Sequence, residues 1–324
     1  LAAFIISTSP AIAQSKVLVK ASPEAGGFSS ARLSRLDSGM NEWVKKKWVN
    51  GSVVLIARRG KIVFDKAYGY NDPDTKAPLD KNGIFRIASQ TKAVTTVAVM
   101  MLWEEGKFSL EDPVSKFIPS FANQTVLNSF NPKDTTYTSI PAKRPVTIRD
   151  LLTHTSGIGY PGIGTPEENA LYAKGTTTGG VGVKDQKLSD VMTRLGSLPL
   201  FFQPGEKWKY GLNHDVLGYL VQVWSGLTLE DFFAKRIFQP LGMKHSAQGL
   251  GRFKLEDMVP CQTEFAAPEA GGGDPAAKDW DWNSPYWQDL GAPWGGMYST
   301  PEDFAVICQL LLDNGTYKSV RLLS

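Results

Sequence analysis

A serine and a lysine stand three residues apart in the run Ser89-Gln90-Thr91-Lys92, the only Ser-x-x-Lys in the chain. On a helix, residues at this spacing lie on one face about a turn apart. A serine hydroxyl attacks a carbonyl efficiently only when a neighbouring base takes its proton. The spacing therefore predicts nucleophilic catalysis, with Ser89 as the nucleophile and Lys92 as the activating amine.

The sequence around this pair predicts the N-terminus of a helix. A mostly apolar helical pattern runs from Ser89 to Gly106, which is typical of a helix buried on nearly every side. Burial and the positive end of a helix both favour the uncharged form of lysine, which is the form that accepts a proton. The free N–H groups of the first turn can also stabilise an oxyanion. The alternative is a serine that only caps the helix, followed by a solvated lysine.

Composition and charge narrow the class of protein. The chain has 324 residues, of which 42% are hydrophobic and 21% charged, and its net charge is +3. These values predict a globular protein with one large domain or two closely packed subdomains, and no nucleic-acid partner. No run approaches the roughly 20 apolar residues of a membrane span, so no span is expected.

The first residues are typical of the end of a secretory signal peptide. The stretch LAAFIISTSPAIAQ combines an apolar run with Ala11-Ile12-Ala13, a small-x-small cleavage site. Residues 1–13 are therefore interpreted as a signal-peptide remnant, and the protein is expected to be exported, either periplasmic or secreted. An apolar N-terminal strand is the alternative.

Two cysteines are too few for a disulfide framework. Cys308 falls in an apolar helical pattern with Phe304, Ile307 and Leu311, so it is expected to be a packed thiol. A bridge between Cys308 and Cys261, which an exported protein allows, is the alternative.

The chain before the Ser-x-x-Lys run predicts a helix and a hairpin. An amphipathic helix is expected over Phe28 to Val49, capped by Ser29 or Ser30. Two strands follow, Val53 to Ala57 and Ile62 to Ala67, separated by a short connection that contains a glycine. This spacing favours a β-hairpin.

After the Ser-x-x-Lys run the pattern is mainly helical. Four threonines with an acidic residue three places later predict capped helix N-termini. They are Thr147, Thr165, Thr228 and Thr300. The helix after Thr228 is expected to end near Pro240. Strands separated from helices in this way indicate an α+β fold rather than alternating βαβ units.

An ordered set of motifs resembles the serine β-lactamases, DD-peptidases and related esterases. Ile87 to Lys92, IASQTK, is similar to their first active-site motif, and Phe202 to Tyr210, FQPGEKWKY, to the approach to their second. Further similar stretches are Arg144 to Gly157 (RPVTIRDLLTHTSG), Pro240 to Met243 (PLGM) and Gly295 to Thr300 (GGMYST). The resemblance covers the chain from about residue 28 onward.

The resemblance implies a β-lactamase/transpeptidase-like fold, with an antiparallel sheet flanked by helices and an inserted all-helical subdomain. The hydrolase domain is expected over 28–324. Its α/β part is expected at 28–88 and about 290–324, and its helical part at about 89–289. Ser89 is expected in the cleft where the two parts meet, and the C-terminal strands are expected to be missing.

The resemblance also implies a third catalytic group. The family's catalytic tyrosine falls on Tyr210, where it relays protons between Ser89 and the leaving group with help from the Lys92 ammonium. A buried core aromatic is the alternative for this residue. The third family motif, Lys-Thr-Gly or a His/Trp-x-Gly variant, is expected beyond Ser324. The run Trp294-Gly295-Gly296 is not taken for it.

The chain departs from the family pattern after the tyrosine. β-Lactamases and DD-peptidases carry Tyr-x-Asn, whose carboxamide contacts the substrate amide, whereas here Tyr210-Gly211-Leu212 places Asn213 one residue late. A site without that donor leaves the polar group of such a substrate unpaired. The run YGLNHDVLG instead resembles the esterase and acyltransferase branch. A carboxylesterase that forms an acyl-enzyme on short acyl esters is therefore the expected function.

Two other functions use the same residues. One is a class C-like β-lactamase or D-amino-acid peptidase, and the other is an acylated penicillin-binding or sensor protein with little turnover. The expected substrate is a small-molecule ester or amide. The sequence has no His-Glu-x-x-His zinc spacing and no Gly-x-Ser-x-Gly nucleophile elbow. Neither a metal nor an organic cofactor is expected.

Other residues near these motifs have weaker signals. His154 is expected to hold the turn after a helix by hydrogen bonds. His214 is expected at the surface of a helix start, with an effect on the pocket near Tyr210 as the alternative. The run 175–182, GTTTGGVG, is expected to be a loose surface loop or else a lid. Five aromatic residues in one loop-like segment are expected either to line an acyl pocket or to pack over the sheet. This aromatic group consists of Trp280, Trp282, Tyr286, Trp287 and Trp294.

Overall fold

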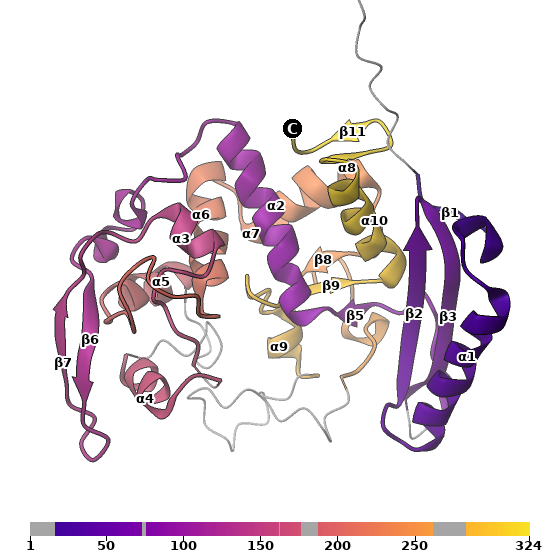
Figure 1. The fold of residues 1–324 in the computed structure, drawn as a ribbon, viewed down its shortest axis with the longest axis horizontal. Helices are drawn as coiled ribbons and strands as arrows, with labels where there is room; N and C mark the ends of the chain where they lie inside the picture. Colours follow the sequence, from indigo (N-terminus) through magenta and orange to yellow (C-terminus); the bar gives the residue numbers. More distant parts are fainter. Residues whose placement is uncertain (1–16, 73–75, 162, 176–186, 262–282) are drawn as a thin grey trace, which may run out of the picture.

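The computed structural model describes residues 17–72, 76–161, 163–175, 187–261 and 283–324 (Figure 1). Residues 1–13, interpreted above as a signal-peptide remnant, lie outside this part of the chain. The signal peptide and the export therefore stay predictions. No helix within the described ranges is long and apolar enough to cross a membrane.

A four-stranded sheet stands at the right of Figure 1. Its strands are β1 (Val19–Lys20), β2 (Gly51–Arg58), β3 (Lys61–Asp72) and β4 (Ala77–Pro78). β2 and β3 form the predicted antiparallel hairpin. Arg59 and Gly60 at its turn have positive φ angles of 54° and 78°, which a tight two-residue hairpin turn requires.

The predicted antiparallel sheet has one parallel pairing in the structure, between β1 and β3. This pairing includes backbone hydrogen bonds from Val19 N–H to Gly60 O at 2.9 Å and from Ala21 N–H to Ile62 O at 3.0 Å. Every residue type except proline carries the same backbone N–H and C=O groups. A two-residue strand of this kind therefore leaves no sequence signal.

Helix α1 (Ser30–Lys45) covers one face of the sheet and begins where the sequence predicts. The Ser29 side chain caps it by accepting a hydrogen bond from the Arg32 N–H. The contact with β2 and β3 is made by Leu33, Leu36, Met40, Val44, Val54, Ile56, Phe64 and Tyr68. Trp43, next to this apolar stripe in the helical spacing, is 46% exposed because it lies at the edge of the stripe.

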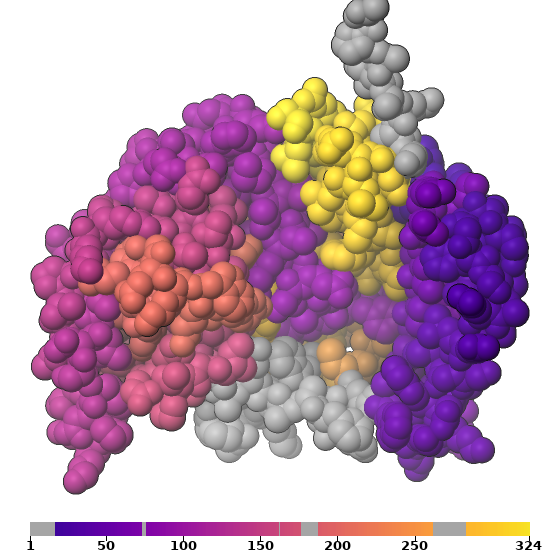
Figure 2. Space-filling view, viewed as in Figure 1, coloured from indigo at the N-terminus to yellow at the C-terminus, as the bar shows by residue number. Residues whose placement is uncertain are grey.

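The opposite face of β2 contacts helix α10 (Pro301–Leu312). Figure 2 shows α10, in yellow, against the N-terminal hairpin, in indigo. Side chains alternate between the faces of a strand, so Val53 and Leu55 point away from α1. They line a cavity of about 690 Å³ between β2 and α10.

The prediction that Cys308 on α10 is a packed thiol was wrong. Ile307 and Leu310 are its core residues, 1% and 0% exposed, whereas Cys308 is exposed and lines the cavity. The packed-thiol prediction was wrong because the helix turns the face with Ile307 and Leu310 inward, about a quarter-turn from the predicted stripe. No disulfide joins Cys261 and Cys308, which contradicts the alternative of a bridge.

Helix α2 (Thr91–Glu104) runs through the centre of the molecule, between the sheet and the helical part (Figure 1). As predicted, most of its sides are buried, and Val94, Ala98 and Val99 are each 0% exposed. It packs against α6 (Asn213–Ser225). The other helices of the middle section are α3 (Ile148–Leu152), α4 (Pro166–Lys174), α5 (Leu188–Gly196), α7 (Leu229–Phe233) and α8 (Gln239–Leu241).

The predicted caps are present. Thr147 and Thr165 form complete capping boxes, and Thr228 and Thr300 each accept a hydrogen bond from the N–H three residues later. A π-helical turn joins α7 to α8, which ends with Gly242 in the left-handed conformation, two residues after Pro240.

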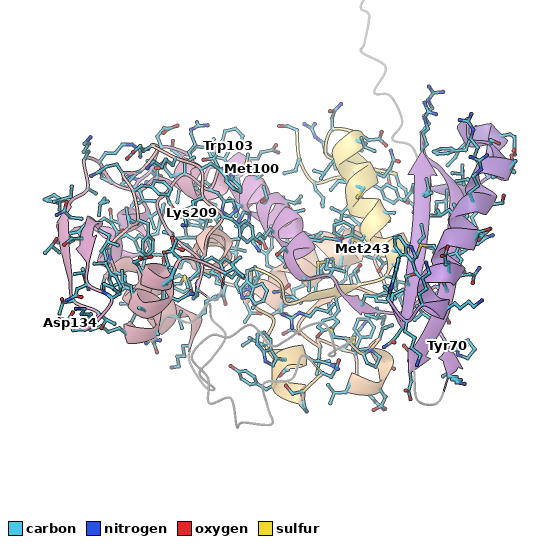
Figure 3. The ribbon with its side chains drawn as sticks, turned by 60° about the horizontal axis from the view of Figure 1, so that its bottom comes forward. Tyr70, Met100, Trp103, Asp134, Lys209 and Met243 are labelled. Carbon is cyan, nitrogen blue, oxygen red and sulfur yellow. The ribbon has the colours of Figure 1, made fainter. Side chains whose placement is uncertain are left out.

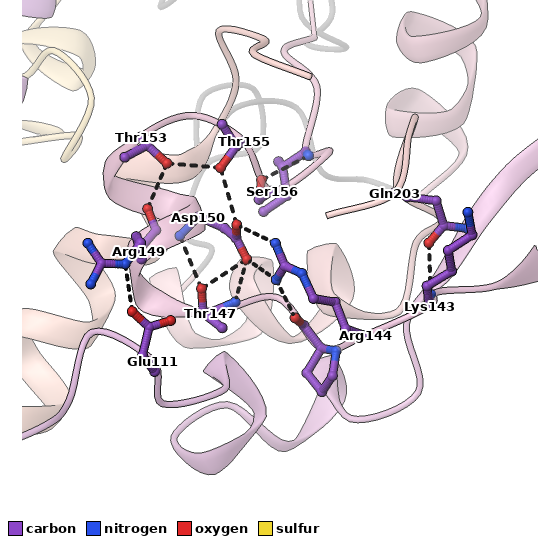
Figure 4. Close-up of polar contacts among 12 residues, drawn as sticks. Glu111, Lys143, Arg144, Thr147, Arg149, Asp150, Thr153, Thr155, Ser156 and Gln203 are labelled. Atoms are coloured by element: carbon purple, nitrogen blue, oxygen red, sulfur yellow. Dashed lines mark hydrogen bonds and ion pairs between the residues drawn. The ribbon is translucent and has the colours of Figure 1, made fainter. Parts of the chain in front are cut away.

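The N-terminus of α3 is held by a polar network around Asp150 (Figure 4). The buried carboxylate accepts hydrogen bonds from the Arg144 guanidinium at 2.6 and 2.9 Å, and from the Thr147 N–H at 2.9 Å. Burial alone raises the pKa of Asp150, but the hydrogen bonds from Arg144 and Thr147 outweigh it and hold the pKa below its ordinary value. The network fixes the segment that leads to His154.

The section predicted to be all-helical also contains a hairpin. β6 (Thr125–Phe130) and β7 (Tyr137–Pro141) pair antiparallel at the far left of Figure 1. The all-helical prediction was wrong here because β7 is exposed along its length. Such a strand lacks the alternation of apolar and polar residues from which strands are predicted.

A small antiparallel sheet ties the strand before Ser89 to the C-terminal part. Its order is β5 (Phe85–Arg86), β9 (Met297–Ser299) and β8 (Ala247–Gln248). The remaining elements are α9 (Pro285–Asp289), β10 (Thr316–Tyr317) and β11 (Val320–Arg321).

Candidate active site

Ser89 stands on a tight turn between β5 and α2. The Ile87 N–H donates to the Met297 carbonyl at 3.0 Å, which ties the end of β5 to β9. Ala88 follows with a φ of 45°, a left-handed conformation that costs about 1–2 kcal/mol for a residue with a Cβ atom. A single 3-10 turn, Ala88–Gln90, then leads into α2. Ser89 is exposed there, at the positive end of the helix.

The structure brings the three predicted site residues together at the Ser89 hydroxyl. Tyr210 Oη lies 2.8 Å from Ser89 Oγ, and Lys92 Nζ lies 3.2 Å from the same oxygen. Tyr210 is 121 residues away along the chain, so the tertiary fold brings it here. Both partners are within hydrogen-bonding distance of the hydroxyl, as general-base activation requires.

Lys92 is buried, 8% exposed, beside a carbonyl and an aromatic ring. Its Nζ donates to the Trp294 carbonyl at 2.8 Å and lies 4.8 Å from the centroid of the Tyr210 ring. None of the ion pairs between described residues includes Lys92. The amine therefore contacts neutral groups: the Ser89 hydroxyl, the Trp294 carbonyl and the Tyr210 ring. These contacts hold Nζ beside the Ser89 hydroxyl.

The cavity beside β2 is not where these groups meet. Ala88 and Gln90 line that cavity, but Ser89, Lys92 and Tyr210 do not. We place the candidate site at the three-residue cluster because catalysis depends on the contacts at the hydroxyl and not on cavity volume.

Tyr210 belongs to a column of four stacked rings. On one side Tyr160 lies 5.4 Å away, centroid to centroid, with an angle of 16° between the rings. On the other side His154 lies at 5.2 Å and 20°, and His214 stacks on His154 at 5.0 Å and 28°. Each stacked pair contributes about 0.5–1.5 kcal/mol beyond its burial. The column fixes the plane of the Tyr210 ring.

The backbone around Tyr210 is also fixed. The Lys209 N–H donates to the His154 carbonyl at 2.9 Å, and the Gly211 N–H donates to His154 Nδ1 at 3.3 Å. Lys209 lies inside the helical part (Figure 3), where its ammonium forms an ion pair with the buried Glu168 carboxylate. The predicted structural role of His154 in hydrogen bonding is confirmed.

The prediction that His214 lies at the surface was wrong, because its exposed fraction is only 5%. The Thr96 hydroxyl donates to the Lys92 carbonyl at 2.8 Å, so it accepts from His214 Nε2 at 3.1 Å. The prediction was wrong because the first turn of α6 is covered by α2, a tertiary contact that the local sequence does not reveal.

Acidification is expected to destabilise the folded chain through His154 and His214. Burial first, and then the charge of Lys92, lower the pKa of His154 from 6.5 to about 4. Burial, His154 and Lys92 lower the pKa of His214 to about 3. Between about pH 6.5 and about pH 4 only the unfolded chain binds these protons, so the free energy of unfolding falls as the pH falls through this window.

Thermal melting at about pH 7.5 and about pH 5 measures this effect. His154→Asn removes one of the two groups and should therefore lose less in Tm between the two pH values than the wild type loses. An equal or larger loss in the variant would contradict the assignment.

The Asn213 side chain forms its hydrogen bonds inside the protein. It is 0% exposed. Oδ1 accepts from the Ser156 hydroxyl at 2.6 Å, and Nδ2 donates to His154 Nδ1 at 2.9 Å. Leu212, at the place of the family's asparagine, is 1% exposed. Neither residue offers an amide to a substrate.

Replacing Gly211 with alanine is expected to displace Tyr210. A Cβ atom at position 211 would lie 2.0 Å from the carbonyl oxygen of Ile158, so the backbone itself must move. We expect a lower Tm and a fall in kcat of about 10- to 100-fold, since displacements near 1 Å have effects of this size. Gly39→Ala on α1, where a Cβ meets nothing within 4 Å, is the control and should raise Tm slightly. Unchanged kcat in the 211 variant would refute the close contact.

Two groups at the site were missed by the sequence analysis. One is the Trp294 carbonyl that accepts from Lys92, and a backbone carbonyl has no sequence signal. The other is Tyr160, which stacks on Tyr210. Its position six residues after His154, in the run that follows LLTHTSG, is the signal that could have found it.

The aromatic group and the glycine-rich run fall only partly within the described residues. Trp287 and Trp294 are each 2% exposed and pack with Ala292. This burial favours a packing role for these two residues rather than the lining of an acyl pocket. Trp280 and Trp282 lie outside the described residues, as does 176–182 of the glycine-rich run. Within the described ranges, no group of three or more His, Cys, Asp or Glu residues is placed to hold a metal ion.

Known proteins resemble this chain over most of its length. The sequence model of the β-lactamase family matches residues 36–322. The chain is 33% identical to Esterase EstB of Burkholderia gladioli over 226 residues, which make up 68% of this chain and 53% of EstB. It is 34% identical to the lovastatin esterase of Penicillium rubens over 205 residues, which make up 61% of this chain and 48% of that protein. It thus spans about half the length of these two curated relatives.

A solved structure has the same fold. EstCE1, described as a hydrolase with promiscuous acyltransferase activity, matches with a TM-score of 0.70 at 24% identity, over 89% of this chain and 74% of that chain. The predicted β-lactamase/transpeptidase-like fold is therefore confirmed. Since the family match includes Ser89, Lys92 and Tyr210 and nearly all of the described elements, the chain belongs to the β-lactamase family.

Proposed function

We propose that the protein is a serine hydrolase that cleaves short acyl esters through an acyl-enzyme on Ser89. The observation that carries this proposal is the cluster at Ser89 Oγ, with Tyr210 Oη at 2.8 Å and Lys92 Nζ at 3.2 Å. A hydroxyl that is exposed to substrate and lies beside two groups able to exchange its proton is suited to attack an ester carbonyl.

Acylation begins with the attack of Ser89 Oγ on the carbonyl carbon. As the C–O bond forms, the hydroxyl proton passes to the lone pair of the Lys92 amine, which lies 3.2 Å away. None of the hydrogen bonds between described residues uses the Ser89 N–H, which is therefore free to stabilise the oxyanion. The tetrahedral intermediate then collapses. The ester C–O bond breaks, and the proton passes to the departing alkoxide, which leaves as an alcohol.

Deacylation repeats these steps with water. Water gives a proton to the Lys92–Tyr210 pair as its oxygen bonds to the acyl carbon. The bond to Ser89 Oγ then breaks, the serine regains a proton and the acid is released. An alcohol in place of water would accept the acyl group instead. Protons and electrons balance in both half-reactions with these side chains alone.

The environment of Asn213 favours esters over amides as substrates. Both polar atoms of its side chain are used inside the protein, by Ser156 and His154. An amide-bearing substrate would therefore lose a partner for its polar group, at a cost of about 1–3 kcal/mol. Two of the relatives above are named esterases, which supports the same substrate class.

Parallel assays of the full-length protein with a short-chain nitrophenyl ester and a chromogenic cephalosporin test the proposal. We expect a kcat/KM for the ester about tenfold or more above that for the cephalosporin, within the range that a cost of about 1–3 kcal/mol for one unpaired polar group produces. Faster turnover of the cephalosporin would identify a β-lactamase. A lasting adduct on Ser89 without product from either compound would identify an acylated sensor, and both results would overturn the proposal.

A further inference from the structure

His154 contacts the Tyr210 ring and the backbone of both neighbours of Tyr210. Its carbonyl accepts the N–H of the preceding residue, Lys209, at 2.9 Å. Its Nδ1 accepts the N–H of the following residue, Gly211, at 3.3 Å. Its ring stacks on the Tyr210 ring at 5.2 Å and 20°. Among the described residues, His154 alone joins both neighbours of Tyr210 and its ring in this way.

We infer that His154 is a positioning residue that holds the Tyr210 hydroxyl within reach of Ser89. This inference rests on the proposed function, in which Tyr210 and Lys92 exchange the Ser89 proton. The hydroxyl lies at the far end of a rigid ring, so a tilt of the ring or a shift of its backbone changes the 2.8 Å distance to Ser89 Oγ directly. A displacement of about 1 Å costs about 100-fold in rate.

The hydrogen bonds require a particular form of His154. Two donors, the Gly211 N–H and the Asn213 amide, point at Nδ1, so this nitrogen must carry a lone pair and the proton must be on Nε2. The buried His214 ring covers the other face of His154. A proton on Nδ1 would point at both donors, so the hydrogen bonds from Gly211 and Asn213 to His154 would be lost.

The backbone at position 154 explains why few residues could replace histidine. Its φ is 56°, in the left-handed region that asparagine, aspartate and histidine occupy more readily than other side chains. Asparagine can adopt this φ and offers a carbonyl oxygen in place of Nδ1, but it has no ring to stack. Alanine has neither the acceptor nor the ring.

This difference gives a graded test in the full-length protein. We expect His154→Ala to lower kcat for the nitrophenyl ester by about 100-fold, with KM within about threefold of wild type. His154→Asn keeps the acceptor and should recover about tenfold of that loss. His245→Asn is the matched control, because His245 is exposed and outside the site, and it should leave kcat unchanged.

The rate at which a fluorophosphonate labels Ser89 is the second readout, because it reports on the nucleophile whatever the substrate is. We expect the same order of rates: wild type, His154→Asn, then His154→Ala. A His154→Ala variant that labels and turns over as fast as wild type, after correction for the folded fraction, would overturn the positioning role. Labelled Ser89 without ester turnover in the wild type would refute the proposed function alone.

Discussion

Replacing Ser89 with alanine is expected to lower kcat/KM for a nitrophenyl ester by about 10⁴-fold or more. The variant lacks the oxygen that forms the acyl-enzyme, and neither Lys92 nor Tyr210 can replace it in that bond. Only the weak background from substrate binding and the remaining polar groups should persist. Steady-state kinetics of the purified full-length variant measures the loss.

Stability separates this result from a folding defect. Ser89 is exposed, so its loss should change Tm by no more than a degree or two. Ser38→Ala is the control, because Ser38 is an exposed serine on α1 whose hydroxyl donates to the carbonyl of Ser34 on the same helix. It should keep full activity. Ester turnover within tenfold of wild type in Ser89→Ala would show that the nucleophile lies elsewhere.

Removal of the Lys92 amine is expected to lower kcat by about 10³-fold, the middle of the range for a lost general base. Lys92→Met is the sharper variant, because methionine keeps much of the apolar stem while removing the nitrogen. Lys92→Ala should lose similar activity but more stability, since it also leaves a cavity in a buried site. The rate of acyl-enzyme formation in a stopped-flow burst separates this step from deacylation.

Charge alone should not restore the activity. Lys92→Arg keeps a positive charge, but a guanidinium does not give up its proton in proteins. This variant should therefore be as inactive as Lys92→Met. Activity of Lys92→Arg near that of wild type would mean that position 92 acts only as a cation, and Tyr210 would then be the base.

Local sequence signals were sufficient for part of the site. Ser89 and Lys92 lie within one helical turn, so local geometry predicts that they share a face, and the structure places the amine 3.2 Å from the hydroxyl. The threonine caps at 147 and 165 are equally local, and both are complete in the structure. Tyr210 could be assigned only through the family resemblance, because 121 residues separate it from Ser89.

The remaining features depend on contacts that no short stretch of sequence encodes. The acceptor for Lys92 is a backbone carbonyl, which every residue type would supply at position 294. His214 is near a helix start, where exposure is common, but α2 covers that turn. Cys308 was placed on the wrong side of α10 because an apolar stripe can be drawn on two adjoining faces of that helix. Only tertiary packing selects between the two faces.

The most direct test is to trap the acyl group. Full-length protein is mixed with a short-chain nitrophenyl ester, quenched in acid during the burst and mapped by peptide mass spectrometry. We expect one acyl group on the peptide that contains Ser89, formed with the burst of nitrophenol and at least about 10³-fold more slowly in Lys92→Met. Turnover of the ester with the acyl group on another residue, or with no acyl-enzyme at any time, would contradict Ser89 as the nucleophile.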